Sequence, residues 1–506
     1  MLLSPLFAAA VASAAPHCLT PFYLALRDQP LEAARVYRPT EAGFVDSAIY
    51  PLRLHWSDPA EADRVTDLIL PMAERVWAIE IDQMGWPAPP PDDGVGGTDA
   101  YDIYFTREET YGGAYTWGFG RDVIPGDNWY SNPTYVAVDT RIDDADMESY
   151  LAHELNHALQ WTLDGRERNA FIWEATAEAI TDIVYDATAY GYEIKSFQLL
   201  PFMSLLHDSY SPPIYPYGYD GYFYEYGGMM FTTYLEEKYG TKDGTLLLQL
   251  WYDLAQPTNA DEPDFLDAVA QVDPSVPSVA AVYTDFSVWR MFAASDDDGA
   301  HFEEGAAFPN SGRVFTEAEF SLADVDGFVA TPDIPPFDLG ATYYRIDLGA
   351  GSTQFLHVDV EGEAGTEWGI AWAVWQTAGG PAVTGSTFVA DGAPLSVDVD
   401  LAGGATAQFG VINNGPPELD PNKAPPARRS FTVTLSLLDT PDTGEADPDA
   451  PDFVNADKGG GEEKAGCGCD QTPGGPGAAV ALAGLALARR ASRRRPKRVT
   501  PCDPEV

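Results

Sequence analysis

The chain has 506 residues, enough for two or three domains, and its 45% hydrophobic and 12% aromatic content is ample for packed cores. Its 78 acidic residues against 29 basic ones give a formal net charge of -49. A field of this sign repels nucleic acids and anionic lipid surfaces, so no nucleic-acid partner is expected and a highly soluble, exported protein is favoured.

Residues 1–16 have the features of a secretory signal peptide. An apolar run from Leu6 to Val11 precedes Ala12-Ser13-Ala14, an A-x-A-like cleavage site, although the usual positively charged start is missing. We therefore expect the protein to be exported. Residues 17–45 could then serve as a propeptide.

The next part of the chain is predicted to contain a helix and several strands. Residues 59–84 have the spacing of apolar side chains that is typical of a helix. Alternating or apolar runs predict strands at Tyr50–Trp56, Tyr101–Phe105 and Thr134–Asp139, and Gly112–Trp117 could add an edge strand. We expect these strands to form a mixed sheet ahead of the helix described next.

That helix carries a complete His-Glu-x-x-His motif, His153-Glu154-Leu155-Asn156-His157, in a chain with only 7 histidines. A chance match has odds on the order of one in a hundred. On a helix, positions i and i+4 lie on one face, so His153 and His157 can bind one metal ion while Glu154 leans toward a metal-bound water. The alternative is an ordinary surface helix that carries two histidines.

The residues around the motif support the helix. Apolar side chains recur at spacings of three and four, at Met147, Leu151, Leu155 and Ala158. Asp143 or Asp144 is the expected N-cap.

The third ligand decides the class of zinc site, because a catalytic zinc ion takes three protein ligands and keeps one position open. The signature with three histidines requires a glycine and a ligand where this chain has Gln160 and Leu163. Glu174 is the better candidate. It lies seventeen residues beyond His157, on the helix predicted over Ala170–Tyr185.

Glu178 follows Glu174 by one helical turn, on the same face. There it could accept a hydrogen bond from the distal N–H of a ligand histidine. The flanking residues are apolar, so both carboxylates are expected to be buried and to need partners: Ala175, Ala177, Ala179, Ile180 and Ile183. The alternative is a solvated helix face.

These residues resemble the gluzincin class of metallopeptidases, whose plan is His-Glu-x-x-His followed by a glutamate on the succeeding helix. The string Trp173–Ala177 is similar to the Asn-Glu-Gly-x-Ala of aminopeptidase N-like enzymes. Tyr224–Gly228 resembles their Tyr-Glu-x-Gly-Ala, which carries the tyrosine that stabilises the transition state. The resemblance thus implies a catalytic role for Tyr224, with Tyr226 as the alternative.

One departure from the aminopeptidase group bears on the substrate. The Gly-x-Met-x-Asn stretch that recognises a free amino terminus is absent, and Gly112–Tyr115 is only a loose substitute. An endopeptidase is therefore favoured over an exopeptidase.

The rest of the chain predicts an α+β protein of two main domains. Helices are expected at Tyr222–Tyr239, Gly244–Leu254 and Ser278–Phe292. They complete a zincin-like catalytic domain over residues 17–335, whose upper half ends at about residue 165. Alternating strands with Gly, Pro and Asp turns then predict a β-sandwich over residues 338–438.

The C-terminal region is predicted to be a tether and a sorting tail. Residues 439–465 are acidic and rich in Pro and Gly, which is typical of disordered linkers. Residues 466–506 carry a Cys pair, an apolar run and an Arg cluster. This order resembles the MYXO-CTERM-type sorting tails of myxobacterial surface proteins, and the whole chain resembles secreted myxobacterial metalloproteases. The resemblance implies export and sorting machinery as partners, display on the cell surface or release, and membrane contact only through the tail.

The sequence also bears on a cysteine-ligated metal site and on a calcium site. All four cysteines lie outside the predicted domain cores, so no Cys-ligated metal site is expected: Cys18, Cys467, Cys469 and Cys502. The turns Asp92-Asp93 and Asp296–Asp298 are rich in carboxylates, which makes Ca²⁺ possible, but no EF-hand spacing is present and Ca²⁺ is not claimed.

The sequence therefore predicts a zinc peptidase with one catalytic Zn²⁺. Glu154 would act as general base on a zinc-bound water, and the substrate would be a peptide or protein. The alternative is a cell-surface adhesion or binding protein that uses the β-sandwich and has an inactive or structural zinc domain. Against this alternative, a structural site needs a fourth protein ligand, and no fourth His or Cys lies near the motif in the sequence.

Overall fold

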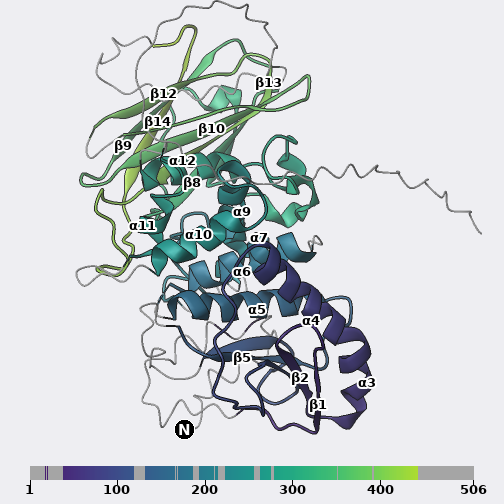
Figure 1. Cartoon of the computed structure of the whole chain (residues 1–506). Coiled ribbons are helices and arrows are strands. Elements are labelled where there is room, and N and C mark those ends of the chain that lie inside the picture. The colour runs from purple at the N-terminus through teal and green to yellow at the C-terminus, as the bar shows by residue number, and fades with distance from the viewer. Residues whose placement is uncertain are drawn as a thin grey trace, which may run out of the picture. The chain divides into compact units, whose positions relative to one another are not determined.

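The computed structural model combines helices with several β-sheets, which is the expected α+β class (Figure 1). It describes Cys18, Thr20 and residues 38–118, 131–165, 167, 169–185, 193–209, 211–214, 221, 223–255, 263–274, 278–349, 351–389 and 393–442. The predicted signal peptide, nearly all of the predicted linker and the whole sorting tail lie outside these residues. Within the described part, no helix has the length and apolar character needed to cross a membrane.

The N-terminal sheet has five strands in the order β1-β2-β3-β5-β4. β2, β3 and β5 run parallel, whereas β1 and β4 are antiparallel to their neighbours at the two edges. Every residue of the two central strands β3 and β5 is buried, as expected of strands covered on both faces. The mixed sheet and the edge strand β4 were predicted, whereas the edge strand β1 was not. The bounds are β1 (Gly43–Asp46), β2 (Leu52–Trp56), β3 (Tyr101–Thr106), β4 (Ala114–Gly118) and β5 (Thr134–Asp139).

The predicted helix between β2 and β3 is present as an unbroken helical run that changes its winding along its length. It ends where Gly85 takes a positive φ of 90°. The run consists of η1 (Pro59–Glu61), α3 (Ala62–Arg64), η2 (Val65–Ile69), α4 (Leu70–Trp77) and η3 (Ala78–Gln83).

The helix with the His-Glu-x-x-His motif, α5 (Met147–Asp164), lies on β4 and β5 and packs against α6 (Ala170–Tyr185) (Figure 1). The predicted N-cap was wrong. The carbonyl of Asp143 accepts a hydrogen bond from the N–H of Asp146 in a preceding turn, and Asp144 pairs with Arg64. Asp146 is the residue at the cap, and its side chain makes no capping bond.

The helical half contains a break that the sequence analysis did not predict. The helix expected over Tyr222–Tyr239 is two helices, α8 (Tyr224–Gly227) and α9 (Met229–Lys238). A Cβ atom on Gly227 would lie 2.1 Å from the carbonyl oxygen of Glu193, and one on Gly228 2.1 Å from the ring of Phe171. These glycines therefore let α8 sit directly on its neighbours. The other helices are α7 (Glu193–Leu199), α10 (Thr245–Leu254), α11 (Phe265–Val269) and α12 (Val279–Trp289).

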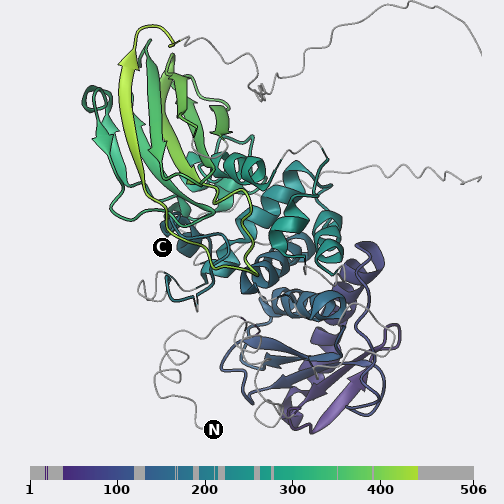
Figure 2. The ribbon, with the colours of Figure 1, turned by 90° about the vertical axis from the view of Figure 1, so that its left-hand side faces the viewer.

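Two sheets form the predicted β-sandwich, seen as two layers in green to yellow in Figure 2. Their orders are β11-β10-β13-β8-β6 and β12-β9-β14-β7, and one apolar core fills the space between them. Because β6 and β7 pair with β8 and β14, the sandwich begins near residue 318, ahead of the predicted boundary at 338. The bounds are β6 (Ala318–Ser321), β7 (Val329–Ala330), β8 (Gly340–Asp347), β9 (Phe355–Gly362), β10 (Trp368–Gln376), β11 (Val383–Val389), β12 (Leu395–Asp400), β13 (Gly404–Asn413) and β14 (Phe431–Leu438).

Candidate metal centre

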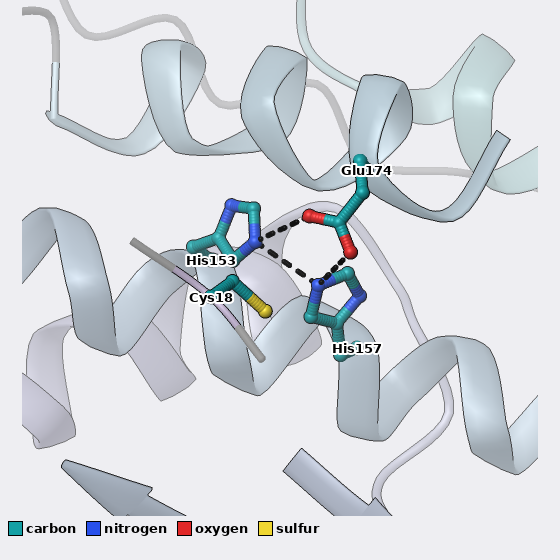
Figure 3. A group of neighbouring side chains, drawn as sticks. All are labelled: Cys18, His153, His157 and Glu174. Atoms are coloured by element: carbon teal, nitrogen blue, oxygen red, sulfur yellow. Dashed lines mark hydrogen bonds and ion pairs between the residues drawn. The ribbon is translucent and has the colours of Figure 1, made fainter. Parts of the chain in front are cut away.

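Three buried side chains that the sequence analysis named as metal ligands converge between α5 and α6. Nε2 of His153 lies 3.0 Å from Nε2 of His157 and 3.1 Å from Oε2 of Glu174. Nε2 of His157 lies 3.3 Å from Oε1 of Glu174. Figure 3 shows the two rings rising from one helix while the carboxylate comes from the other.

The spacing of these atoms suits a metal ion. Donors held about 2.0–2.1 Å from a tetrahedral zinc ion are about 3.3 Å apart, close to the three distances found. Oε1 of Glu174 is buried, and its contact with Nε2 of His157 at 3.3 Å is longer than an ordinary charge-assisted hydrogen bond. Two imidazoles and a carboxylate are also a donor set that zinc prefers.

The outer nitrogens of both histidines are held by groups that fix the orientation of the rings. Nδ1 of His157 lies 2.7 Å from Oε1 of Gln160, and Nδ1 of His153 lies 3.2 Å from Oε1 of Glu178. With the Nδ1 proton directed outward in a neutral ring, each Nε2 lone pair would face the common centre. Two such lone pairs 3.0 Å apart beside a carboxylate would repel one another, and a metal cation or a proton between them removes the repulsion.

Glu178 thus lies on His153, where the sequence analysis placed it, whereas the role of Gln160 was missed. The side-chain amide of Gln160 also donates to the carbonyl of Trp173 on α6 and to Oδ1 of Asn156. Gln160 therefore links the motif helix to the helix that carries Glu174. Its position three residues after His157 on a buried helix face was the signal available in the sequence.

Glu154 is fully buried beside the three converging side chains. The hydroxyl of Thr116 on β4 lies 2.8 Å from its Oε2, and its Oε1 has no hydrogen-bond partner among the described residues. Burial raises the pKa of this carboxyl, which the nearby charges of His157 and His153 partly oppose. The carboxylate is therefore held in place through one oxygen.

Charge within the site is unevenly distributed. Burial opposes ionisation of Glu174, yet the charge of His157 and the hydrogen bonds of both histidines outweigh it and lower the pKa of Glu174 to about 2. Burial also opposes the charge of His153, but Glu178 and the other partners raise its pKa well above the usual value. Glu174 is thus the permanent anion of the group, as a ligand carboxylate must be.

The two candidate tyrosines point in different directions. The hydroxyl of Tyr224 donates to the backbone carbonyls of Met203 and Ser204, at 3.3 and 3.1 Å, so the predicted placement of Tyr224 at the site was wrong. The ring of Tyr226 instead stacks on His153, with centroids 5.9 Å apart and planes 12° apart. Tyr226, the alternative in the sequence analysis, is the tyrosine at the metal centre.

A fourth donor is present that the sequence analysis excluded. Cys18 is buried, and its Sγ and the ligand atoms of the three other residues all lie within 4.8 Å of one another (Figure 3). The expectation that no cysteine lies near the site was therefore wrong. Because Cys18 is far from the motif in the chain, no local pattern connects them.

Cys18 and Thr20 lie against the sheet edge and the buried carboxylate. Cys18 forms an isolated parallel bridge with Ala114 of β4. The hydroxyl of Thr20 accepts a hydrogen bond from the N–H of Thr116 at 3.1 Å and donates to Oε2 of Glu154 at 3.3 Å. The hydroxyl of Tyr226 donates to the carbonyl of Cys18 at 3.1 Å.

The two carboxylate-rich turns weighed for calcium have protein partners instead. Asp92 pairs with Arg38, and Asp296 pairs with Arg313 and Arg345. Within the described residues, the group around His153 is where metal-ligating side chains converge.

Comparisons with known proteins add little to this geometry. No protein-family model and no curated protein matches the chain. Among solved structures, CorA, a surface-associated copper-binding protein of Methylomicrobium album BG8, shares 12% identity with a TM-score of 0.19, over 24% of this chain and 98% of its own. The pre-peptidase C-terminal domain of collagenase from Bacillus anthracis shares 11% identity with a TM-score of 0.16, over 24% of this chain and 96% of its own. Likenesses this weak carry no argument, so the functional conclusion rests on the site.

Proposed function

We propose that this protein is an exported or cell-surface zinc-dependent endopeptidase with a zincin-like catalytic domain. The observation that carries the proposal is the convergence of His153, His157 and Glu174 beside the buried carboxylate of Glu154. A structural zinc site has no use for a further buried carboxylate, because its ligands already satisfy the ion. A hydrolase needs one as the general base.

The chain's own residues divide the chemistry among them. Zn²⁺ bound by the two histidines and Glu174 would supply a Lewis acid and lower the pKa of water at the site. Glu154, held through Oε2 by Thr116, would accept a proton from the attacking water and deliver it to the leaving amine. The hydroxyl of Tyr226 would donate to the developing oxyanion, a role that the resemblance had given to Tyr224.

The sheet edge supports a peptide as the substrate. β4 is an edge strand of its sheet, and Thr116 on this strand contacts Glu154. An extended peptide binds such an edge through main-chain hydrogen bonds, largely independent of its side chains. The bridge between Cys18 and Ala114 is an instance of extended chain at this edge. The absence of the Gly-x-Met-x-Asn stretch that recognises a free amino terminus favours cleavage within a chain over cleavage at a terminus.

One observation favours the second candidate, an adhesion or binding protein with a structural zinc ion. Cys18 supplies a fourth donor, and four protein donors are the usual set of a closed structural site. The two candidates differ in what they require of Glu154. The endopeptidase needs its carboxylate, whereas the adhesion protein does not.

The test compares two substitutions on the same helix. Glu154→Gln keeps the shape of the side chain and should leave about one zinc per chain while lowering casein hydrolysis by at least about a thousandfold. His153→Ala should lose both zinc and hydrolysis. Asp67→Asn, at an exposed position remote from the site, is the control and should change neither. Full hydrolysis by the Glu154→Gln protein would contradict the proposal.

A further inference from the structure

We propose that Cys18 and Thr20 keep the metal centre closed, with the thiolate of Cys18 as a fourth metal ligand. This inference rests on the proposed peptidase function and concerns how that site is regulated. It makes the protein described by the structure a latent form, in which Cys18 and Thr20 must leave the site before a substrate can enter.

The first observation is the position of the sulfur. Sγ of Cys18 is part of the same group of ligand atoms as the two histidines and Glu174, and all four residues are buried. Three protein ligands leave one position of a tetrahedral zinc ion open for water. A thiolate is a strong zinc ligand, and occupation of that position by Cys18 would exclude the water that the reaction needs.

The second observation is the contact with the proposed base. The hydroxyl of Thr20 donates to Oε2 of Glu154, and the N–H of Thr20 lies 3.2 Å from Sγ of Cys18. Thr20 therefore contacts the carboxylate and the sulfur at once. A carboxylate that accepts hydrogen bonds from Thr20 and Thr116 through one oxygen is a weaker base toward a third group.

The third observation concerns the remaining catalytic group and the substrate edge. The Tyr226 hydroxyl, which is proposed to bind the oxyanion, donates a hydrogen bond to the carbonyl of Cys18. Cys18 also forms the β-bridge with Ala114 of β4. The metal position, the base, the oxyanion donor and the sheet edge are thus each engaged by Cys18 or Thr20. A cysteine retained only as a structural ligand would need just the contact with the metal position.

Two spectroscopic readouts test the ligand without any assay of activity. In the Cys467→Ala/Cys469→Ala/Cys502→Ala protein, Cys18 is the only thiol. With Co²⁺ in place of zinc, this protein should show a near-ultraviolet sulfur-to-cobalt charge-transfer band, and further replacement of Cys18 by Ala should abolish it. The thiol should react with Ellman's reagent at least about tenfold more slowly with zinc than after chelation. Absence of the band, or equal reactivity with and without zinc, would overturn the inference.

Activity tests the regulation. Cys18→Ala and Cys18→Ser should retain zinc and hydrolyse casein about tenfold or more faster than the wild-type protein. In these variants no thiolate competes with water for the fourth position on the metal, so the open form is more populated. Thr20→Val, which removes only the contact with Glu154, should give a smaller increase. Loss of zinc from both Cys18 variants would make Cys18 a structural ligand and overturn the inference.

The same measurements separate failure of the inference from failure of the proposed function. If the wild-type and Cys18→Ala proteins are equally active and Glu154→Gln abolishes that activity, the latency is contradicted but the peptidase function is not. If every variant retains zinc and none hydrolyses casein, both the peptidase function and its regulation are contradicted.

Discussion

The hydroxyl of Tyr226 donates a hydrogen bond to the backbone carbonyl of Cys18, although 208 residues separate the two in the chain. Tyr226 stands on α8 with its ring against His153, while Cys18 bridges the sheet edge opposite. A peptide carbonyl already occupies the donor that the proposed reaction would use. In the proposed peptidase, the carbonyl of a bound peptide would take the place of this carbonyl.

The two tyrosines of α8 should behave oppositely when each loses its hydroxyl. Tyr226→Phe should lower kcat for casein hydrolysis by about a hundredfold or more with little change in zinc content, because a donor to the oxyanion is lost. Tyr224→Phe should leave kcat unchanged and lower the free energy of unfolding by about 1 kcal/mol, since its hydrogen bonds to Met203 and Ser204 are structural. The assay is best run in the Cys18→Ala background. Unchanged kcat in the Tyr226→Phe protein would remove this residue from the reaction.

Glu178 should tune how tightly the metal is held. Its carboxylate orients the ring of His153 through Nδ1, so Glu178→Ala should weaken zinc binding by about 10–100-fold, measured by competition with a chromogenic chelator. Glu178→Gln, which keeps an acceptor oxygen, should recover part of that loss. Identical zinc affinity in the wild-type and Glu178→Ala proteins would show that Glu178 does not support His153.

His207 should make stability depend on pH between about 6.5 and 4. Burial, with a smaller effect of the Arg428 charge, lowers the pKa of His207 to about 4, and its Nδ1 accepts a hydrogen bond from the N–H of Ser204. Since a histidine in the unfolded chain binds a proton near pH 6.5, the unfolded state binds more protons below that pH. Stability from the neutral ring is therefore complete above pH 6.5 and lost as the pH falls toward 4, by up to about 3 kcal/mol.

The measurement is urea unfolding at pH 7.0, 5.5 and 4.5, compared with His207→Asn. Asparagine preserves an acceptor near Nδ1 but does not titrate. The wild-type protein should lose stability relative to the variant as the pH falls. A constant difference between the two proteins across this range would contradict the assignment.

The sequence was most informative where the geometry of the site is local. His153, His157, Glu174 and Glu178 were expected to lie together, and they do, because the spacing along two consecutive helices determines which side chains share a face. The observed bounds of α6, Ala170–Tyr185, are those predicted from the apolar pattern. A pair of buried helices leaves little freedom for side chains at these positions.

Prediction failed where the backbone direction depends on contacts distant in the chain. Phe223 takes a left-handed φ of 62° at the start of α8, and Gly227 and Gly228 then fix α8 against α7 and α6. This combination turns Tyr226 rather than Tyr224 toward His153. Nothing in the alternation of tyrosines in the sequence distinguishes the two.

Cys18 and Thr20 were missed for a different reason. Thr20 and Glu154 are 134 residues apart, and neither Cys18 nor Thr20 belongs to a periodic apolar segment. Their position depends on pairing at the edge of β4, which any extended stretch of chain could make. A sequence pattern cannot choose among such stretches.

Because the proposed ligands belong to two helices, the stability of the folded state would depend on the concentration of free zinc. His153 and His157 belong to α5 and Glu174 to α6, so an ion held by all three acts as a cross-link between the helices. Any state in which α5 and α6 separate loses the ion, and free zinc at a hundred times its dissociation constant would favour the packed state by about 2.7 kcal/mol. If the protein is exported as proposed, no metal-buffered cytosol surrounds it, and scarcity of zinc would shorten its survival among proteases as well as reduce the proposed activity.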